Sequence, residues 1–159
     1  MASVTVISVG NLKEKYLEAA VLEYKKRLSQ YAGVEIIELK EERIANEDDH
    51  SEIERALARE GEKILSSVPK DAVKLALCIE GKQYSSEELA AIVGKGVDAT
   101  GKLCFIIGSS HGLAEGVKAA CDYRLSFSKL TFPHQLVRPL LFEVIYRSFT
   151  ILAGKKYHK

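Results

Sequence analysis

Cysteine is scarce in this sequence, and its few copies do not pair. The 159 residues include three cysteines, Cys78, Cys104 and Cys121, and no two of them form a C-x-x-C motif. An odd number of scattered cysteines argues against a disulfide framework and against a zinc site. We therefore predict a protein of the reducing cytoplasm that binds no metal. Cys78 and Cys104 lie in apolar runs, where an inert buried thiol is the simplest interpretation.

Long apolar runs and a leader sequence are missing as well. No apolar stretch approaches the roughly 20 residues that a membrane-spanning helix needs. The start, Met1 to Thr5, has neither a basic cluster nor a long apolar segment, so we predict no signal peptide and no membrane partner. With 47% apolar and 28% charged residues, the composition is that of a soluble globular protein, and the length predicts a single domain over residues 1–159.

Acidic residues are rare towards the end of the chain. Residues 101–159 carry nine Lys and Arg against three Asp and Glu, whereas residues 1–100 carry 14 against 19. Glu143 is the only acid in residues 123–159. A basic end on a chain of net charge +1 indicates an anionic partner, although many solvated surfaces are equally uneven.

Strand-like and helix-like patterns alternate along the sequence. Short β-branched or apolar runs predict strands over residues 4–9, 34–39, 73–79, 103–107 and 124–127. Apolar residues at spacings of three and four predict helices over residues 17–31, 51–68, 85–97, 113–121 and 134–152. The polar residues between the second strand and the second helix are typical of a mobile loop. The alternation predicts an α/β fold with a mostly parallel sheet flanked by helices.

Local signals place some of the ends of these elements. Ser-x-x-Glu capping boxes at residues 51–54 and 85–88 predict two helix starts. Gly81 predicts the end of the third strand, whose almost continuous apolar run is typical of burial on both faces. Thr131 is a candidate N-cap for the last helix, and Pro139 fits that helix only in its first turn or at a kink.

Ligands of parallel sheets bind beyond the carboxyl ends of the strands, which directs attention to the loops after Ile79, Ile107 and Phe127. The second of these loops has two glycines, Gly108 and Gly112, around small residues and before a helix. Glycine lets a backbone approach a ligand closely, and a helix start offers free N–H donors. An ordinary tight turn explains the loop equally well. It lacks the third glycine of a dinucleotide fingerprint and the lysine of a P-loop.

Polar side chains also interrupt the apolar pattern of the last helix. Arg138, Glu143 and Arg147 form surface ion pairs in one interpretation, and the two arginines contact phosphate in the other. His134, just before them, follows a segment of hydroxyls and a lysine. A lone histidine in such a place is more often a surface residue than a catalytic one.

Several of these segments together resemble one known family. They are Leu77–Lys82, Phe105–Gly108 with Gly112–Leu113, Leu125–His134 (LSFSKLTFPH), Glu143 with Tyr146–Arg147, and Tyr157–Lys159 (YHK). Their order and spacing, and the total length, are similar to those of the small bacterial SPOUT methyltransferases that methylate a pseudouridine of 23S ribosomal RNA. The resemblance covers the whole chain, and LSFSKLTFPH and YHK are its most specific parts.

The resemblance implies a fold that topology rules alone would not predict. Connections between strands and helices normally do not thread loops, so those rules favour an open, doubly wound sheet. SPOUT enzymes instead have a C-terminal deep trefoil knot and form homodimers. The wide apolar stripe of the last helix is consistent with burial both in the knot and at a two-fold interface.

The resemblance also implies the methyl donor, S-adenosylmethionine, and its binding residues. Carried over to this sequence, these are Leu77, Gly108, Phe127, Ser128, Lys129, Leu130, Thr131 and Phe132. Loops at strand ends supply the apolar walls and backbone hydrogen bonds that adenine needs. The sequence departs from the family at Ser109, where a second glycine is usual. A side chain there either narrows the pocket or shifts the loop.

The implied reaction is an in-line methyl transfer to ring nitrogen N(3) of the pseudouridine, with no metal. The enzyme must align the two groups, exclude water and help to remove the ring proton. Candidates for positioning the base or accepting the proton are His134, Glu143 and His158, and Tyr157 with His158 is favoured on the substrate side. The expected RNA contacts are Arg138, Arg147, Lys155, Lys156, Tyr157 and Lys159.

The size and charge of the chain suggest how it would recognise RNA. It has no separate RNA-binding domain, so we expect recognition of the shape of an assembled ribosome, with a second subunit contributing surface. Three alternatives stay open. They are a non-catalytic ribosome-binding protein with the same knotted fold, a nucleotide-using α/β enzyme such as a flavin binder, and a thiol-dependent hydrolase.

Overall fold

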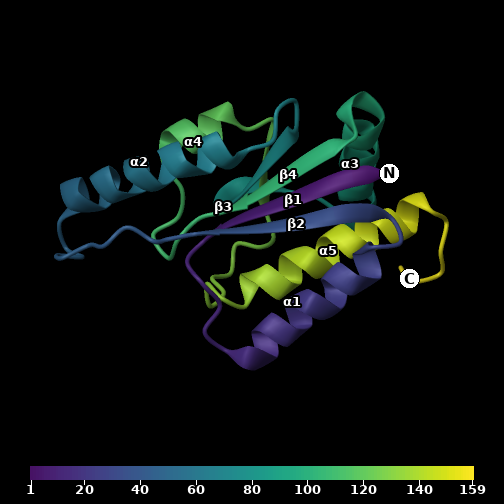
Figure 1. The fold of residues 1–159 in the computed structure, drawn as a ribbon, viewed down its shortest axis with the longest axis horizontal. Coiled ribbons are helices and arrows are strands. Elements are labelled where there is room, and N and C mark those ends of the chain that lie inside the picture. Colours follow the sequence, from purple (N-terminus) through teal and green to yellow (C-terminus); the bar gives the residue numbers. More distant parts are fainter.

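A computed structural model describes all of residues 1–159 (Figure 1). The strands are β1 (Ala2–Val9), β2 (Ala32–Leu39), β3 (Val73–Gln83), β4 (Lys102–Ile107) and β5 (Tyr123–Ser126). The helices are α1 (Lys15–Leu28), α2 (His50–Ser67), α3 (Ser86–Thr100), α4 (Glu115–Ala120) and α5 (Val137–Leu152). Strands and helices therefore alternate along the chain, as the sequence predicts.

The five strands form one sheet in the order β2-β1-β4-β3-β5. Every neighbouring pair is parallel. This confirms the predicted α/β class with a parallel sheet. The carboxyl ends of β3, β4 and β5 meet at the same edge, because parallel strands all point the same way. The trefoil knot implied by the resemblance stays a prediction.

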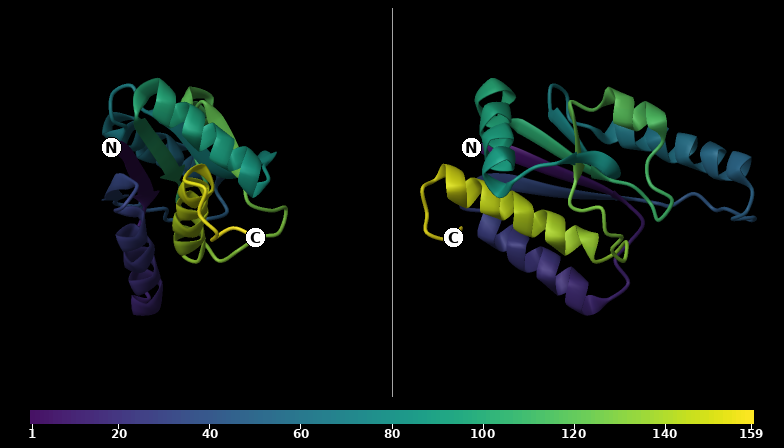
Figure 2. Two further views of the ribbon diagram at one scale, coloured as in Figure 1. Left: turned by 90° about the vertical axis from the view of Figure 1, so that its right-hand side faces the viewer. Right: turned by 180° about the vertical axis from the view of Figure 1, so that it is seen from behind.

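Helices cover both faces of the sheet (Figures 1 and 2). On one face, α1, α3 and α5 pack over the strands, and Phe105 and Phe142 are buried there. On the other face, α2 and α4 contribute Ile64 and Val117, which pack with Ile106 of β4. Each such side chain stabilises the fold by about 1.5–3 kcal/mol when fully buried. β4 is buried on both faces because it lies at the centre of this three-layer arrangement.

The helix starts agree only in part with the capping signals. The Ser85 box is confirmed, because its Oγ accepts from the Glu88 N–H at 3.1 Å and Glu88 accepts from the Ser85 N–H at 2.8 Å. The predicted box at Ser51 is wrong. Asp49 caps α2 instead, and its carboxylate accepts from the N–H groups of Ser51 and Glu52 at 3.0 and 3.3 Å.

The third strand and the last helix also differ from their predicted limits. β3 does not end at Gly81 but runs to Gln83, past an irregularity opposite β5, and its outer part is exposed, with Ile79 64% accessible. Gly81 is needed because a Cβ there would lie 2.8 Å from backbone carbons of β5. Thr131 is not the N-cap of α5, which begins at Val137 and has Pro139 in its first turn, as predicted.

Candidate active site

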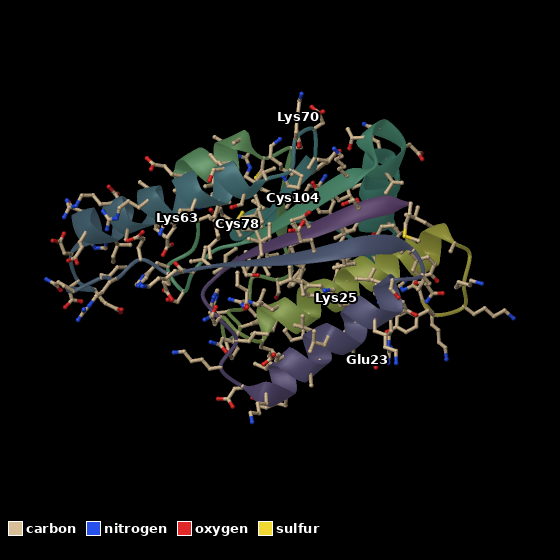
Figure 3. All side chains as sticks on the ribbon, viewed as in Figure 1. Glu23, Lys25, Lys63, Lys70, Cys78 and Cys104 are labelled. Carbon is tan, nitrogen blue, oxygen red and sulfur yellow. The ribbon has the colours of Figure 1, made fainter.

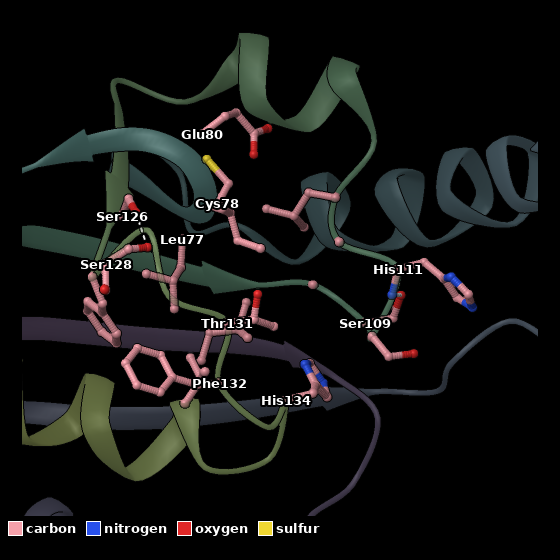
Figure 4. A pocket seen from close by; sticks show the side chains of 18 of the residues that line it. Leu77, Cys78, Glu80, Ser109, His111, Ser126, Ser128, Thr131, Phe132 and His134 are labelled. Atoms are coloured by element: carbon pink, nitrogen blue, oxygen red, sulfur yellow. Dashed lines mark hydrogen bonds between the residues drawn. The ribbon is translucent and has the colours of Figure 1, made fainter.

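A cavity of about 330 Å³ lies beyond the carboxyl ends of β4 and β5 and beside residues 77–80 of β3 (Figure 4). Two of the three loops that the sequence indicated, those after Ile107 and Phe127, line it, whereas the residues after Ile79 belong to β3. Its volume is in the range of small-molecule sites. Seven of the eight expected donor-binding residues line it, namely Leu77, Gly108, Phe127, Ser128, Leu130, Thr131 and Phe132. Lys129 is exposed and is not among the lining residues. The lining combines aromatic walls with exposed loop backbone, which suits an adenosine group.

The glycine loop after β4 is closed on itself. A Cβ on Gly108 would lie 2.2 Å from the carbonyl oxygen of Gly112, so no other residue fits this backbone. The Gly112 N–H donates to the Ser109 carbonyl at 2.9 Å, and Gly112 has a φ of +91°. The two glycines thus serve one purpose, a turn tight enough to bring backbone to the cavity wall.

Ser109 is accommodated without opening this turn. The residue is only 5% exposed and lines the cavity, and its Oγ accepts from the His111 N–H at 3.3 Å. The serine side chain therefore hydrogen-bonds within the loop. It also faces a buried acid, Glu60 of α2, whose charged form its hydroxyl favours.

Glu60 is a buried carboxylate that sequence analysis missed. It is 3% exposed, its Oε2 accepts from the Glu42 N–H at 2.9 Å, and its Oε1 has no hydrogen-bond partner. Burial raises the pKa of Glu60, against the opposing effect of the Glu42 N–H. A signal was present in the sequence, because Glu60 falls between Ala56 and Ile64 at the spacing of the buried helix face.

Replacing Glu60 with glutamine is expected to stabilise the fold at neutral pH. The raised pKa means that the Glu60 carboxylate binds a proton more readily in the folded state than in the unfolded state. Folding stability therefore falls as the pH rises from the pKa of the unfolded state through that of the folded state, and the loss is complete at neutral pH. Glutamine still accepts from the Glu42 N–H but carries no charge. In thermal unfolding at about pH 7, each kcal/mol gained raises Tm by about 2–4 °C.

The pH dependence of the change in Tm, and a control substitution on the same helix, test whether charge burial is the cause. At about pH 4, where the parent carboxylate is largely protonated, the gain from Glu60→Gln should shrink. Glu62→Gln, an exposed acid on the same helix, should change Tm little at either pH. An equal gain at both pH values would mean that charge burial is not the cause.

His134 is the one candidate catalytic residue that lines the cavity (Figure 4). Burial lowers its pKa, and the nearby guanidinium of Arg138 lowers it further, while the Val9 carbonyl and Glu41 act in the opposite direction. A lowered pKa leaves the imidazole neutral at pH 7, with one ring nitrogen able to accept a proton. The residue thus has both the place and the protonation state of a general base.

The structure overturns the interpretation of Arg138 as a phosphate contact. Its side chain is inside the protein, 3% exposed, and donates to Glu38 at 2.8 Å and to the carbonyls of Val9 and Gly10 at 3.2 and 2.6 Å. Sequence alone could not show this, because the partners are at least 100 residues away in the chain. An arginine in the first turn of an apolar helix is the signal that could have suggested it.

Glu143 and His158 belong to a second cluster, outside the cavity lining. Glu143 accepts from Arg147 at 2.7 and 3.3 Å and from the Tyr157 hydroxyl at 3.0 Å. Arg147 also contacts Nδ1 of His158 at 3.1 Å and lies over the Tyr157 ring at 4.8 Å. Burial and the bond to Glu143 raise the pKa of Tyr157 to about 12, so its phenol stays protonated. The C-terminal tail is therefore held against α5.

Both ring nitrogens of His158 are engaged. A guanidinium can only donate, so Nδ1 accepts from Arg147, and Nε2 carries the proton and donates to Glu87 at 2.8 Å. His158 thus has no free lone pair in this arrangement. Three of the five N–H donors of Arg147 are likewise engaged, by Glu143 and His158. By contrast, the lysines of the tail are exposed and make no ion pair; they are Lys155, Lys156 and Lys159.

A second hollow, of about 240 Å³, lies between the cavity and the tail cluster. It shares Phe127 and Phe132 with the cavity. Its other end is lined by Ser86 and Val144, the neighbours in sequence of Glu87 and Glu143. The two groups of predicted site residues are therefore separate, and the second hollow adjoins the cavity at Phe127 and Phe132.

The environments of the three cysteines do not favour a reactive thiolate. Cys104 lies within the sheet (Figure 3), and burial raises the pKa of its thiol to about 12 and that of Cys121 to about 11. Cys78 lines the cavity rather than being fully buried, and burial raises its pKa as well. Raised pKa values disfavour the thiolate that a thiol-dependent hydrolase needs. No group of three or more His, Cys, Asp or Glu side chains is placed to bind a metal. None of the helices combines the length and the apolar composition that a membrane span requires.

Sequence and structure comparisons connect this geometry to known proteins. Proteins called ribosomal RNA large subunit methyltransferase H are 45% identical over 158 residues in Bacillus pumilus and 49% identical over 156 residues in Caldicellulosiruptor bescii. These alignments cover 98–99% of this chain and 99% of each relative.

Solved structures share the fold at much lower identity. One, described as giving structural insights into the 2-OH methylation of C/U34 on tRNA, has a TM-score of 0.53 and 14% identity, and the match covers 97% of this chain and 99% of that one. A probable methylase family protein from Haemophilus influenzae has the same score and identity over 97% of this chain and 67% of its own. A family model described as a predicted SPOUT methyltransferase matches residues 2–158. The chain therefore belongs to the SPOUT methyltransferase family.

Proposed function

We propose that this chain transfers a methyl group from S-adenosylmethionine to N(3) of a pseudouridine in 23S ribosomal RNA. The observation that carries the proposal is the cavity at the ends of β4 and β5 and beside β3, lined by seven of the eight residues expected to bind the donor. Full-length relatives named as methyltransferases of large-subunit ribosomal RNA support the choice of substrate. Residues 1–159 act as one domain. A protein that methylates ribosomes acts where the ribosomes are, in the cytoplasm.

Different residues of the cavity bind the donor, exclude water and accept the proton. The donor supplies a methyl group already activated on a sulfonium. The Gly108 turn offers backbone polar groups to the donor, and Phe127 and Phe132 enclose it and exclude water. His134 accepts the N(3) proton of the base, because it is neutral at pH 7 and faces the same cavity.

The active enzyme is a homodimer that recognises the assembled ribosome. Leu130, Leu136 and Leu140 leave apolar surface exposed near the cavity, Leu130 to 70%, and a second copy of the chain would cover it. The tail cluster of Glu143, Arg147, Tyr157 and His158 supplies the substrate side. The exposed lysines of the C-terminal tail, Lys155, Lys156 and Lys159, are the phosphate contacts.

The proposal is tested by tritium transfer from labelled S-adenosylmethionine to whole ribosomes. One set of ribosomes carries the unmethylated pseudouridine, and a matched set carries uridine at that position. Label in the first set and little in the second is the expected result. No label in either set from a protein that binds the donor would favour the alternative, a non-catalytic ribosome-binding protein.

Removing the lysines of the tail should weaken ribosome binding and its dependence on salt. Each phosphate contact contributes about 0.7–0.9 to the slope of log affinity against log salt, so changing Lys155, Lys156 and Lys159 to alanine together should reduce the slope by up to about 2–3. Binding is measured across a salt series. Lys70→Ala, an exposed lysine outside the tail, is the control. An unchanged slope in the triple variant would place the RNA elsewhere.

A further inference from the structure

The segment that carries His134 is tied to the turn after the first strand. Gln135 accepts from the Lys13 N–H at 2.8 Å and donates to the Asn11 carbonyl at 3.1 Å. Arg138 donates to the carbonyl of Gly10 at 2.6 Å. His134 makes none of these hydrogen bonds, although the Val9 carbonyl, at the end of the first strand, lies close enough to its ring to favour protonation.

Arg138 is the buried part of this attachment. One terminal nitrogen binds Glu38 of β2 and the other binds the carbonyls of Val9 and Gly10, so a single fork joins β1, β2 and α5. A planar guanidinium suits this task because its donors are fixed relative to one another. Its Nε–H has no acceptor, so the positive charge is not fully compensated on that side.

We propose that Arg138 is a positioning residue for methyl transfer, which holds His134 at the cavity and keeps its ring available to accept a proton. The inference rests on the proposed role of His134 as the base. Arg138 does not line the cavity and so acts through its neighbour. Val9 joins the two residues, because its carbonyl accepts from Arg138 and also lies close enough to His134 to affect its protonation.

The charges around His134 give the direction of the effect. Arg138 of α5 disfavours the imidazolium, whereas Glu41, after β2, and the Val9 carbonyl of β1 favour it. Glu38 of β2 faces Arg138 and offsets part of its charge. Burial, the largest effect on His134, still lowers its pKa when the guanidinium is lost, but the remaining charged and polar groups all favour the protonated ring. The pKa of His134 should therefore rise, and a smaller fraction of the ring should be free to accept a proton.

The test compares Arg138→Met, which removes the charge and the fork, with Arg138→Lys, which removes only the fork. The pKa of His134 is measured by NMR titration of the free protein, and kcat and KM for the donor are measured across pH. For Arg138→Met we expect the His134 pKa to rise and the acidic limb of kcat to move to higher pH. At neutral pH we expect kcat to fall about 10- to 100-fold, with the KM for the donor within about threefold of the parent. Arg138→Lys should lower kcat with a smaller change in pKa.

The His134 pKa and the pH dependence of kcat together distinguish the role of Arg138 from the proposed role of His134 as the base. If the NMR pKa rises while the acidic limb of kcat stays, Arg138 governs His134 but His134 is not the base. If neither the pKa nor kcat changes in a folded Arg138→Met, the inference is wrong. Should that variant not fold, Gln135→Ala loosens the same attachment at a partly exposed site, and unchanged kcat there would likewise overturn the inference.

Discussion

Replacing Gly108 with alanine is expected to abolish binding of S-adenosylmethionine. The new Cβ would lie 2.2 Å from the carbonyl oxygen and 2.6 Å from the carbonyl carbon of Gly112, and neither of these backbone atoms can move without opening the turn. The clash therefore displaces the loop at the centre of the donor cavity. We expect donor affinity, measured by isothermal titration calorimetry, to fall at least about 100-fold, a loss of about 2.7 kcal/mol or more.

The control for this change is another glycine close by in the chain. Gly116 lies in α4, where a Cβ would meet nothing within 4 Å. Gly116→Ala should leave donor affinity unchanged and raise stability by about 0.5–1 kcal/mol, because alanine favours a helix. Donor binding by Gly108→Ala at the parent affinity would show that this turn is not part of the donor site.

Replacing His134 with alanine should produce the largest fall in the rate of methyl transfer. General base catalysis typically contributes 10²–10⁴-fold, so we expect kcat to fall by about that factor while donor affinity changes much less. Single-turnover transfer to ribosomes bearing the unmethylated pseudouridine measures the step directly. Because the pKa of His134 is lowered from the ordinary histidine value of about 6.5, the parent should keep most of its rate at pH 6.5 and lose it only at lower pH.

His158→Ala serves as the comparison, because this histidine belongs to the tail cluster. Its loss frees Arg147 and Glu87 and releases the tail, so the expected effect is a raised KM for ribosomes. A parent-like kcat in His134→Ala, at every pH, would rule out His134 as the base. A steep pH-dependent loss in His158→Ala instead would transfer that role to the tail.

Sequence patterns predicted the elements well where neighbours in the chain determine them. The Ser85 box and the first-turn Pro139 depend on residues within one helical turn, and both are confirmed. The Ser51 box failed because Asp49, two residues earlier, offers a carboxylate to the same helix start. Gly81 was misinterpreted because its role is a close approach to β5, more than 40 residues later, which no local signal can reveal.

The same distinction applies to the site. The donor loops were predictable, because parallel strands bring their carboxyl ends to one edge whatever the details of packing. The roles of the charged residues were not, because they depend on distant partners. Arg138 and Arg147 look equivalent on one helix, yet one is buried against Glu38 and Gly10 and the other holds the tail.

The hydrogen bonds of the Arg138 guanidinium have a consequence for folding during synthesis. One of them joins residues 128 positions apart, and β1, the first strand to be made, lies between β2 and β4. A nascent chain that stops before α5 can pair β1 with β2 and β4, and the Gly10 N–H can donate to the Leu39 carbonyl at 2.7 Å, but the carbonyls of Val9 and Gly10 lack their guanidinium donor. Long-range pairing of this kind folds slowly and late. The segment that carries His134 should therefore be attached to the first strand only when the last helix has been synthesised.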